Sequence, residues 1–310
     1  MVLREAAAEE LRRGLSRTPK EVSSKFFYDE RGSVLFEEIT RLPEYYLTRT
    51  ERSLLERVAP EWIAQVRPRS LVELGAGSAS KTRIILDAMR ATGTLHRYVP
   101  VDISAEFLAD TSAALAAQYP ELLTTPVVAD ISGEAELPRG LPGPVVFAFL
   151  GSTIGNFEHA AAVRLLRAVC EAMEPADRFL LGTDLHKSPE VLEAAYNDSQ
   201  GVTAEFNLNM LRVLNALTGA DFDPAAFRHR AFYDPERRRI EMHLVSTRAQ
   251  RVTIPGAGVF EFREGEPLRT EISRKFDRAG VREMLAEAGL RLEHWRTDAD
   301  GYYALALARR

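Results

Sequence analysis

The sequence contains very little cysteine and no recognisable metal-binding pattern. Its 310 residues include one cysteine, Cys170, so no disulfide can form within the chain. Six histidines are scattered without the spacing of a metal site, and no cysteine cluster accompanies them. A G-x-x-x-x-G-K-[ST] phosphate loop and a G-x-S-x-G nucleophile motif are also absent. We therefore expect no metal, and we exclude the disulfide-rich, P-loop and serine-hydrolase classes.

Neither sign of charge dominates, and long apolar runs are missing. Lys and Arg number 40 against 45 Asp and Glu, a net charge of -5, which gives no broad basic field. Nucleic acid and anionic membranes are therefore not expected partners. The opening MVLREAAAEELRRGLSR lacks the apolar block of a signal peptide, and no apolar run has membrane-spanning length. We expect a cytoplasmic monomer that acts on a small molecule.

Helical and strand-like segments alternate between about residues 50 and 185. Apolar runs such as SLVELG, RYVPVDIS and GPVVFAFLG are separated by amphipathic stretches such as SKTRIILDAMRAT and EHAAAVRLLRAVCEAM. This order predicts parallel βαβ units, and hence an α/β doubly wound sheet with helices on both faces. The final segment LRLEHWRTDADGYYALALARR predicts an antiparallel hairpin at the sheet edge, which resembles the ending of the Class I (Rossmann-like) methyltransferase fold.

Two parts of the chain do not follow this alternation. The second of them contains RHRAFYDPERRRIEMHLVSTRAQRVTI, two strand-like runs around a turn, preceded by helical segments. We therefore predict a methyltransferase-like domain over residues 50–186 and 276–310. Residues 1–49 and 187–275 are predicted to form a discontinuous accessory domain that binds the substrate.

The stretch LVELGAGSASKTRIIL predicts a strand, a glycine loop and the start of a helix. Its glycines permit a tight turn, but Ser80 replaces the third glycine of the dinucleotide fingerprint, which argues against a pyrophosphate. Asp102 ends the next predicted strand, where it can accept from both ribose hydroxyls. Asp130 ends the third, where it can accept from the adenine amino group. These acids favour an adenosine without phosphate, such as the cationic S-adenosylmethionine.

Segments from both predicted domains match a known family. KFFYDERGSVLFEEITRLPEYYLTRTE, FLGSTIGNF, AAYNDSQGVTAEFN, IEMHLVSTRAQRV and TEISRKF, together with the glycine loop, follow one another as in that family over nearly the whole chain. The sequence thereby resembles the L-histidine Nα-methyltransferases of ergothioneine biosynthesis (EgtD). The resemblance implies that S-adenosylmethionine is the methyl donor and that L-histidine is trimethylated to hercynine.

The resemblance also implies roles for individual residues. On the cofactor side these are Gly75, Lys81, Asp102 and Asp130, with Lys81 near the methionine carboxylate. On the substrate side, Tyr28 and Asn156 would act at the reacting amine. The amino and carboxylate groups would be contacted by Tyr45, Asn156 and Tyr196. The imidazole would be surrounded by Met242, Glu271 and Ser273. Ile131 stands where an aromatic neighbour of the adenine is expected, so cofactor affinity is expected to differ.

The residue types suit this chemistry. Tyrosine rings offer an apolar wall and cation-π attraction to an increasingly methylated ammonium group. Asn156 follows GSTIG at a predicted strand end, where its amide can accept from an amine or donate to a carboxylate. Glu271 and Ser273 share one face if RTEISRKF is a strand, and they offer a matched acceptor and donor to an imidazole.

Three other functions fit parts of the pattern. A related enzyme could methylate another, aromatic amino acid, although an unpaired Glu271 facing a benzene ring would be costly. A nicotinamide dehydrogenase could use the same sheet, but Ser80 and the terminal hairpin disfavour it. A catalytically silent adenosine-binding regulator is the third alternative, and only turnover separates it from an enzyme.

Overall fold

The computed structural model describes residues 2–131 and 136–310, and the chain divides into two compact units. The accessory unit comprises Met1–Tyr46 and Lys187–Ser273, and the sheet unit comprises Leu47–His186 and Arg274–Arg310. The boundary between residues 186 and 187 is the predicted one, and the other two lie two or three residues before the predicted positions. Both units are therefore assembled from chain segments that are distant in sequence.

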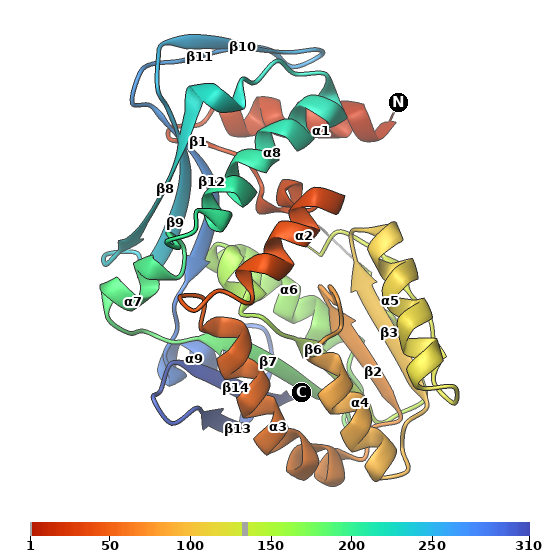
Figure 1. Ribbon diagram of the computed structural model, residues 1–310. Coiled ribbons are helices and arrows are strands. Elements are labelled where there is room, and N and C mark those ends of the chain that lie inside the picture. The colour runs from red at the N-terminus through yellow and green to blue at the C-terminus, as the bar shows by residue number, and fades with distance from the viewer. Residues whose placement is uncertain (1, 132–135) are drawn as a thin grey trace. The chain divides into compact units, whose positions relative to one another are not determined.

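The sheet unit is built on one large, mainly parallel sheet with strand order β13-β14-β7-β6-β2-β3-β4, while β5 pairs with β3 (Figure 1). The strands are β2 (Ser70–Leu74), β3 (Arg97–Asp102), β4 (Leu123–Thr124), β5 (Val127–Val128), β6 (Val145–Phe149), β7 (Arg178–Asp184), β13 (Arg291–Thr297) and β14 (Tyr303–Arg309). The connecting helices are α3 (Leu47–Val66), α4 (Thr82–Ala91), α5 (Ala105–Gln118), α6 (His159–Ala172) and α9 (Arg278–Glu287), with a 3-10 turn, η2 (Thr153–Asn156). This is the predicted α/β doubly wound architecture.

Each face of this sheet is covered by its own set of helices. Successive side chains of a strand point to opposite faces, and both sets of β6 side chains are apolar. Phe147 and Phe149 pack with residues of α6 and α9. Val146 and Ala148 pack with residues of α3, α4 and α5 on the other face. Burial on both faces explains why β6 reads as an unbroken apolar run rather than an alternating one.

One predicted strand is interrupted. The sequence predicts a single strand through LTTPVVADI, but the structure contains two two-residue strands, β4 and β5, on either side of the Thr125–Pro126 step. Proline has no N–H to donate to a sheet ladder, which accounts for the break. The expectation that Asp130 ends a strand is therefore wrong, because β5 ends at Val128 and Asp130 lies in the loop beyond it.

The carboxyl-terminal hairpin forms as predicted. Strands β13 and β14 pair antiparallel around the DADG turn, and β14 also pairs antiparallel with β7. Strand β14 thus lies between β7 and the edge strand β13, and Tyr303 at its start is fully buried. The last strand of the chain is therefore an interior strand of the sheet, not an edge strand.

The accessory unit contains a four-stranded sheet with order β1-β12-β9-β8, packed against α8, and a separate two-stranded hairpin β10-β11 (Figure 1). Its strands are β1 (Lys20–Glu21), β8 (Phe227–Asp234), β9 (Arg239–Ser246), β10 (Gln250–Ile254), β11 (Gly258–Phe262) and β12 (Pro267–Arg274). Its helices are α1 (Val2–Leu15), α2 (Glu30–Ile39), α7 (Pro189–Ala194) and α8 (Val202–Thr218), with 3-10 turns η1 (Ser24–Phe27) and η3 (Pro224–Ala226). The predicted DPERRR turn joins β8 to β9.

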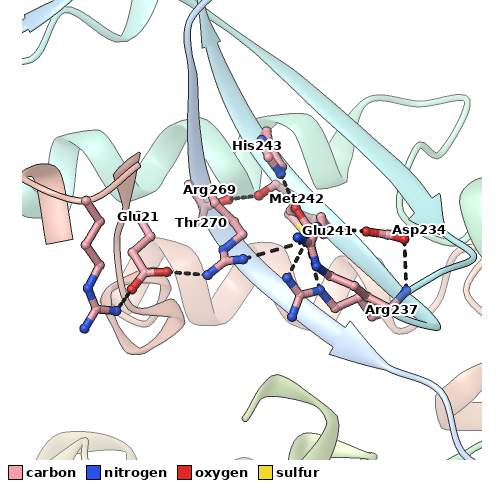
Figure 2. Close-up of polar contacts among 10 residues, drawn as sticks. Glu21, Asp234, Arg237, Glu241, Met242, His243, Arg269 and Thr270 are labelled. Atoms are coloured by element: carbon pink, nitrogen blue, oxygen red, sulfur yellow. Dashed lines mark hydrogen bonds and ion pairs between the residues drawn. The ribbon is translucent and has the colours of Figure 1, made fainter. Parts of the chain in front are cut away.

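A buried carboxylate, Glu241, organises one face of β9 (Figure 2). Its oxygens accept from Arg239 at 2.5 and 2.9 Å and from His243 Nε2 at 2.8 Å, and Arg269 lies 3.7 Å away. Arg269 in turn pairs with Glu21 of β1. Burial by itself would raise the pKa of Glu241, but the hydrogen bonds from His243 and Arg239 and the nearby positive charges bring it down to about 2.

The depressed pKa of Glu241 makes stability depend on pH below the usual Glu range. As the pH falls, Glu241 is protonated in the unfolded state before it is protonated in the folded state. Its contribution to the free energy of unfolding is therefore complete above about pH 4.5 and is lost as the pH falls toward 2. The loss amounts to roughly 3 kcal/mol. Urea unfolding across this window should show a steeper pH dependence for the native chain than for Glu241→Gln. Equal slopes would contradict the assignment.

Two further features are absent from the part of the chain that the structure describes. Among residues 2–131 and 136–310, no helix is both long enough and apolar enough to cross a membrane. Within the same ranges, no three His, Cys, Asp or Glu side chains are grouped so as to hold a metal ion.

Candidate active site

The glycine loop of the sheet unit is tied to the end of β3. Both Gly75 and Gly77 have positive φ, at 65° and 50°, which side chains other than glycine adopt at a cost. The Gly77 amide donates to Asp102 Oδ2 at 3.2 Å, and the Ser104 amide donates to Oδ1 at the same distance. Asp102 is half-buried. Its carboxylate therefore stands beside the loop with lone pairs left for further donors.

Glu73, the acid that precedes the loop, points into the core instead. It is 3% exposed and accepts from Thr82 Oγ1 at 2.5 Å and from Tyr98 OH at 2.6 Å. Burial raises its pKa to about 7 against the opposing effect of these hydrogen bonds. Glu73 thus joins β2 to α4 and β3, and it is a structural carboxylate.

The two other residues of the predicted cofactor set, Lys81 and Asp130, lie around the same strands, as does Ile131. Lys81 follows the loop, and its ammonium pairs with the carboxylate of Glu51. Asp130 is half-buried in the loop after β5. Ile131 packs partly buried against the sheet core, and a Cβ on Gly75 would lie 3.9 Å from its Cδ1. An aliphatic side chain therefore takes the place expected for an aromatic ring beside the glycine loop.

Asn156 ends η2, the 3-10 turn that follows β6. The turn is held by Ser152, which has a left-handed φ of 57° and whose Oγ accepts from the Asp184 amide at 2.8 Å. The Gly155 amide donates to the Ser152 carbonyl at 2.8 Å. Asn156 is half-buried. Its backbone is thus fixed by the strand ends of β6 and β7, as expected for a residue at the carboxyl edge of a parallel sheet.

The predicted tyrosines of the accessory unit lie in one aromatic cluster. Tyr28 meets Phe36 and Phe206 edge-on, with ring centroids 5.9 and 5.8 Å apart. Phe36 meets Tyr45 at 6.3 Å, and Tyr45 meets Tyr196 at 6.4 Å. Edge-to-face packing at these distances is favourable, and it fixes the ring orientations. Segments 28–45 and 196–206, far apart in sequence, thereby form a single wall.

Tyr196 connects this cluster to β12. Its hydroxyl donates to Ser273 Oγ at 2.8 Å, and both side chains are buried. Glu271 lies two residues earlier on the same strand face and is half-buried. Met242 of β9 is 1% exposed, and its carbonyl accepts from Thr270 of β12 at 3.1 Å (Figure 2).

The backbone of Tyr196 is anchored as well. His229 Nε2 lies 2.9 Å from the Tyr196 carbonyl, and Asn207 Nδ2 lies 2.9 Å from His229 Nδ1 and 3.1 Å from the His243 carbonyl. A carbonyl can only accept, so His229 donates through Nε2 and accepts through Nδ1. Burial lowers the pKa of His229, which favours this neutral form.

Within the accessory unit, the structure thus links Tyr28 to Tyr45 through Phe36, and it links Tyr45 to Tyr196 and Tyr196 to Ser273 directly. Glu271 lies on the same strand face as Ser273. The cofactor set belongs to the sheet unit, with Asn156. Sequence reasoning missed Phe36 and Phe206, whose aromatic side chains occur in the quoted segments GSVLFEE and AEFN. It also missed His229, because a single histidine in a strand carries no distinctive signal.

Comparisons with known proteins identify the family of this chain. A family model described as histidine-specific, S-adenosylmethionine-dependent methyltransferase matches residues 7–310. The chain belongs to this family. It is 44% identical to a histidine N-alpha-methyltransferase of Mycolicibacterium smegmatis, over 99% of this chain and 97% of the relative. This is a relation over essentially the full length of both proteins.

A fungal relative and a solved structure are also similar to this chain. This methyltransferase is 30% identical to ergothioneine biosynthesis protein 1 of Neurospora crassa, over 81% of this chain and 30% of that protein. A solved S-adenosylmethionine-dependent methyltransferase of Clostridium acetobutylicum shares the fold with a TM-score of 0.52 at 11% identity, covering 88% of this chain and 97% of that one. The predicted family, Class I fold and methyl donor are confirmed.

Proposed function

We propose that this enzyme transfers methyl groups from S-adenosylmethionine to the α-amine of L-histidine, three times in succession, to form hercynine for ergothioneine biosynthesis. The observation that carries this proposal is a chain of contacts that ends on the strand carrying Glu271. It runs from Tyr28 through Phe36, Tyr45 and Tyr196 to Ser273. An aromatic wall suited to an alkylated amine therefore leads to a polar pair suited to an imidazole.

The cofactor residues fit the methyl donor. Asp102, half-buried beside the loop, would accept from the ribose hydroxyls, and Asp130 from the adenine amino group. Gly75 leaves room for close approach of the backbone, and Lys81 would hold the methionine carboxylate. When bound, S-adenosylmethionine supplies a methyl group on a positively charged sulfur. Sulfonium and ammonium charges suit a pocket lined by carboxylates.

Tyr28 and Asn156 are proposed to act at the amine. Methyl transfer is an in-line displacement, so the amine must present a free lone pair in a fixed direction. Tyr28 is 39% exposed although its ring is packed, so its hydroxyl can take part in removing an amine proton to water. The amide of Asn156 would orient the amine or carboxylate. Tyr45 and Tyr196 would hold the same groups.

Glu271 and Ser273 are proposed to select the imidazole. A neutral imidazole has one donor and one acceptor nitrogen, which match a carboxylate and a hydroxyl. The Ser273 oxygen accepts the hydrogen bond of the Tyr196 hydroxyl, and the O–H of Ser273 would donate to an imidazole nitrogen. Met242 would pack against the ring.

The proposal is tested by incubating the purified protein with S-adenosylmethionine and each standard amino acid, followed by mass spectrometry. Histidine should gain up to three methyl groups, and the other amino acids none. Methylation of an aromatic amino acid instead would retain the fold and donor but overturn the imidazole assignment. Absence of methylation with intact donor binding would favour the silent regulator.

Removing the Tyr196 hydroxyl should weaken substrate binding selectively. Tyr196→Phe keeps the ring contact with Tyr45 but removes the hydrogen bond that the Tyr196 hydroxyl donates to Ser273. We expect the KM for histidine to rise about tenfold, the cost of about one lost hydrogen bond, with donor affinity unchanged. Tyr233→Phe, half-buried on β8, is the matched control. A KM equal to that of the native enzyme would remove Tyr196 from the substrate set.

We also propose that the enzyme acts in the cytoplasm as a monomer, the state expected from its sequence. The presence of the substrate-side aromatic cluster within one chain supports the monomeric state. Sedimentation velocity over a range of concentrations should give a single species of about one chain mass, and a dimer at every concentration would contradict it.

A further inference from the structure

Glu51 of α3 is a fully buried carboxylate to which no role has been assigned so far. It is 0% exposed, yet it lies on a helix whose other buried residues are apolar. Burying an isolated carboxylate is very costly, so its partners must offset the lost hydration. Such a group persists only where several donors converge on it.

Three donors from different parts of the sheet unit meet at Glu51. The Lys81 ammonium pairs with Oε2. The Gly151 amide lies 2.9 Å from both oxygens, and the Tyr303 hydroxyl donates to Oε1 at 2.7 Å. Lys81 follows the glycine loop, Gly151 follows β6, and Tyr303 begins β14. One carboxylate therefore joins the loop to two strands of the sheet.

The sheet is shaped to accept this carboxylate. A Cβ on Gly182 of β7 would lie 2.2 Å from Glu51 Oε1 and 2.6 Å from the Tyr303 hydroxyl. Any side chain at this position would displace one of them. Glycine in the middle of a buried strand is unfavourable in itself, and it commonly marks such a close approach.

The two side chains of the Glu51–Lys81 ion pair differ in their exposure to solvent. The side chain of Glu51 is completely buried, whereas that of Lys81 is 18% exposed. A Cβ on Gly151 would lie 3.4 Å from the Lys81 nitrogen, so the ammonium also stands against the Gly151 backbone. An ammonium has three donors, so Lys81 can bind Glu51 and still present a donor to a ligand.

We propose that Glu51 is a positioning residue for the methyl donor. It holds the Lys81 ammonium and the Gly151 turn where the amino-acid tail of S-adenosylmethionine binds, and it acts on that tail through Lys81. This inference rests on the assignment of Lys81 to the methionine carboxylate. The competing explanation is that Glu51 merely anchors α3 to the sheet, in which case its loss would affect all parts of the ligand alike.

The test compares two ligands that differ in the tail. S-adenosylhomocysteine has the amino-acid tail, whereas methylthioadenosine has the same nucleoside without it. By calorimetry, Glu51→Gln should weaken S-adenosylhomocysteine binding about tenfold or more, the effect of misplacing one charged hydrogen bond, and leave methylthioadenosine binding unchanged. In turnover, the KM for S-adenosylmethionine should rise while the KM for histidine stays constant. Equal weakening of both ligands, or of neither, would overturn the proposal.

A double-mutant cycle separates this inference from the assignment on which it rests. Lys81→Gln should produce the same tail-selective loss, and adding Glu51→Gln to it should cause little further loss. No effect of Lys81→Gln would refute the role proposed for Lys81 itself. A full effect of Lys81→Gln with none of Glu51→Gln would refute only the inference on Glu51.

Tyr303→Phe provides a second variant that keeps both charges. It removes one donor to Glu51 while retaining the buried ring. We expect a smaller loss, about threefold, for S-adenosylhomocysteine and none for methylthioadenosine. If Glu51→Gln fails to fold, Tyr303→Phe tests the proposal in its place. Weaker binding of S-adenosylhomocysteine alone would support the proposal. Unchanged binding of both ligands, or equal weakening of both, would overturn it.

Discussion

Glu271→Ala is expected to lower kcat/KM for L-histidine about a thousandfold, an effect of about 4 kcal/mol. The substitution removes a hydrogen bond to a charged acceptor, worth about 1.5 to 3 kcal/mol, and leaves the imidazole N–H without a partner in a half-buried site. Sites built around a polar group of the substrate discriminate strongly for this reason. The effect should appear mainly in the KM for histidine, measured by the release of S-adenosylhomocysteine.

Two controls define what this result would mean. Glu261→Ala removes the same charge from β11 of the accessory unit, where the side chain is 79% exposed, and should leave both KM values unchanged. Glu271→Gln keeps the shape and an acceptor oxygen without the charge, so it should fall between the native enzyme and the alanine variant. If donor affinity fell as much as histidine affinity in Glu271→Ala, the residue would not be a specificity element.

Asp102→Ala is expected to weaken binding of the methyl donor by about a thousandfold. The proposed ribose contacts comprise two hydrogen bonds to one carboxylate, each worth about 1.5 to 3 kcal/mol. The same carboxylate accepts from the Gly77 and Ser104 amides at 3.2 Å, so its removal also loosens the glycine loop. Calorimetry with S-adenosylhomocysteine measures this effect without turnover.

The ligand pair used for Glu51 also tests Asp102. Because methylthioadenosine retains the ribose, Asp102→Ala should weaken both ligands, in contrast to the tail-selective loss expected for Glu51→Gln. Asp110→Ala on α5 removes an exposed aspartate from the same unit and should change neither affinity. Retention of methylthioadenosine binding in Asp102→Ala would place the ribose elsewhere.

Much of the fold could be predicted because its signals are local. Apolar runs that fit buried parallel strands, amphipathic helices between them and the DADG turn each depend on a few neighbouring residues. The prediction was wrong where a local breaker opposed the pattern: Pro126 divides one expected strand into β4 and β5, which leaves Asp130 beyond the strand end. The predicted alternation at Glu271 and Ser273 agrees with β12, because side-chain alternation follows directly from strand geometry.

The sequence by itself determined the fold class, the methyl donor and the histidine-specific family, because these depend on short motifs in a set order. Only the tertiary structure decided which buried polar groups meet. Glu51 and Lys81 are separated by β2, and Tyr303 lies near the chain terminus, yet the Lys81 ammonium and the Tyr303 hydroxyl both bind the Glu51 carboxylate. Likewise, His229 reaches Tyr196, and Tyr196 reaches Ser273, across large sequence separations. Such contacts arise from the packing of distant segments, where the cost of burying a polar group selects its partner.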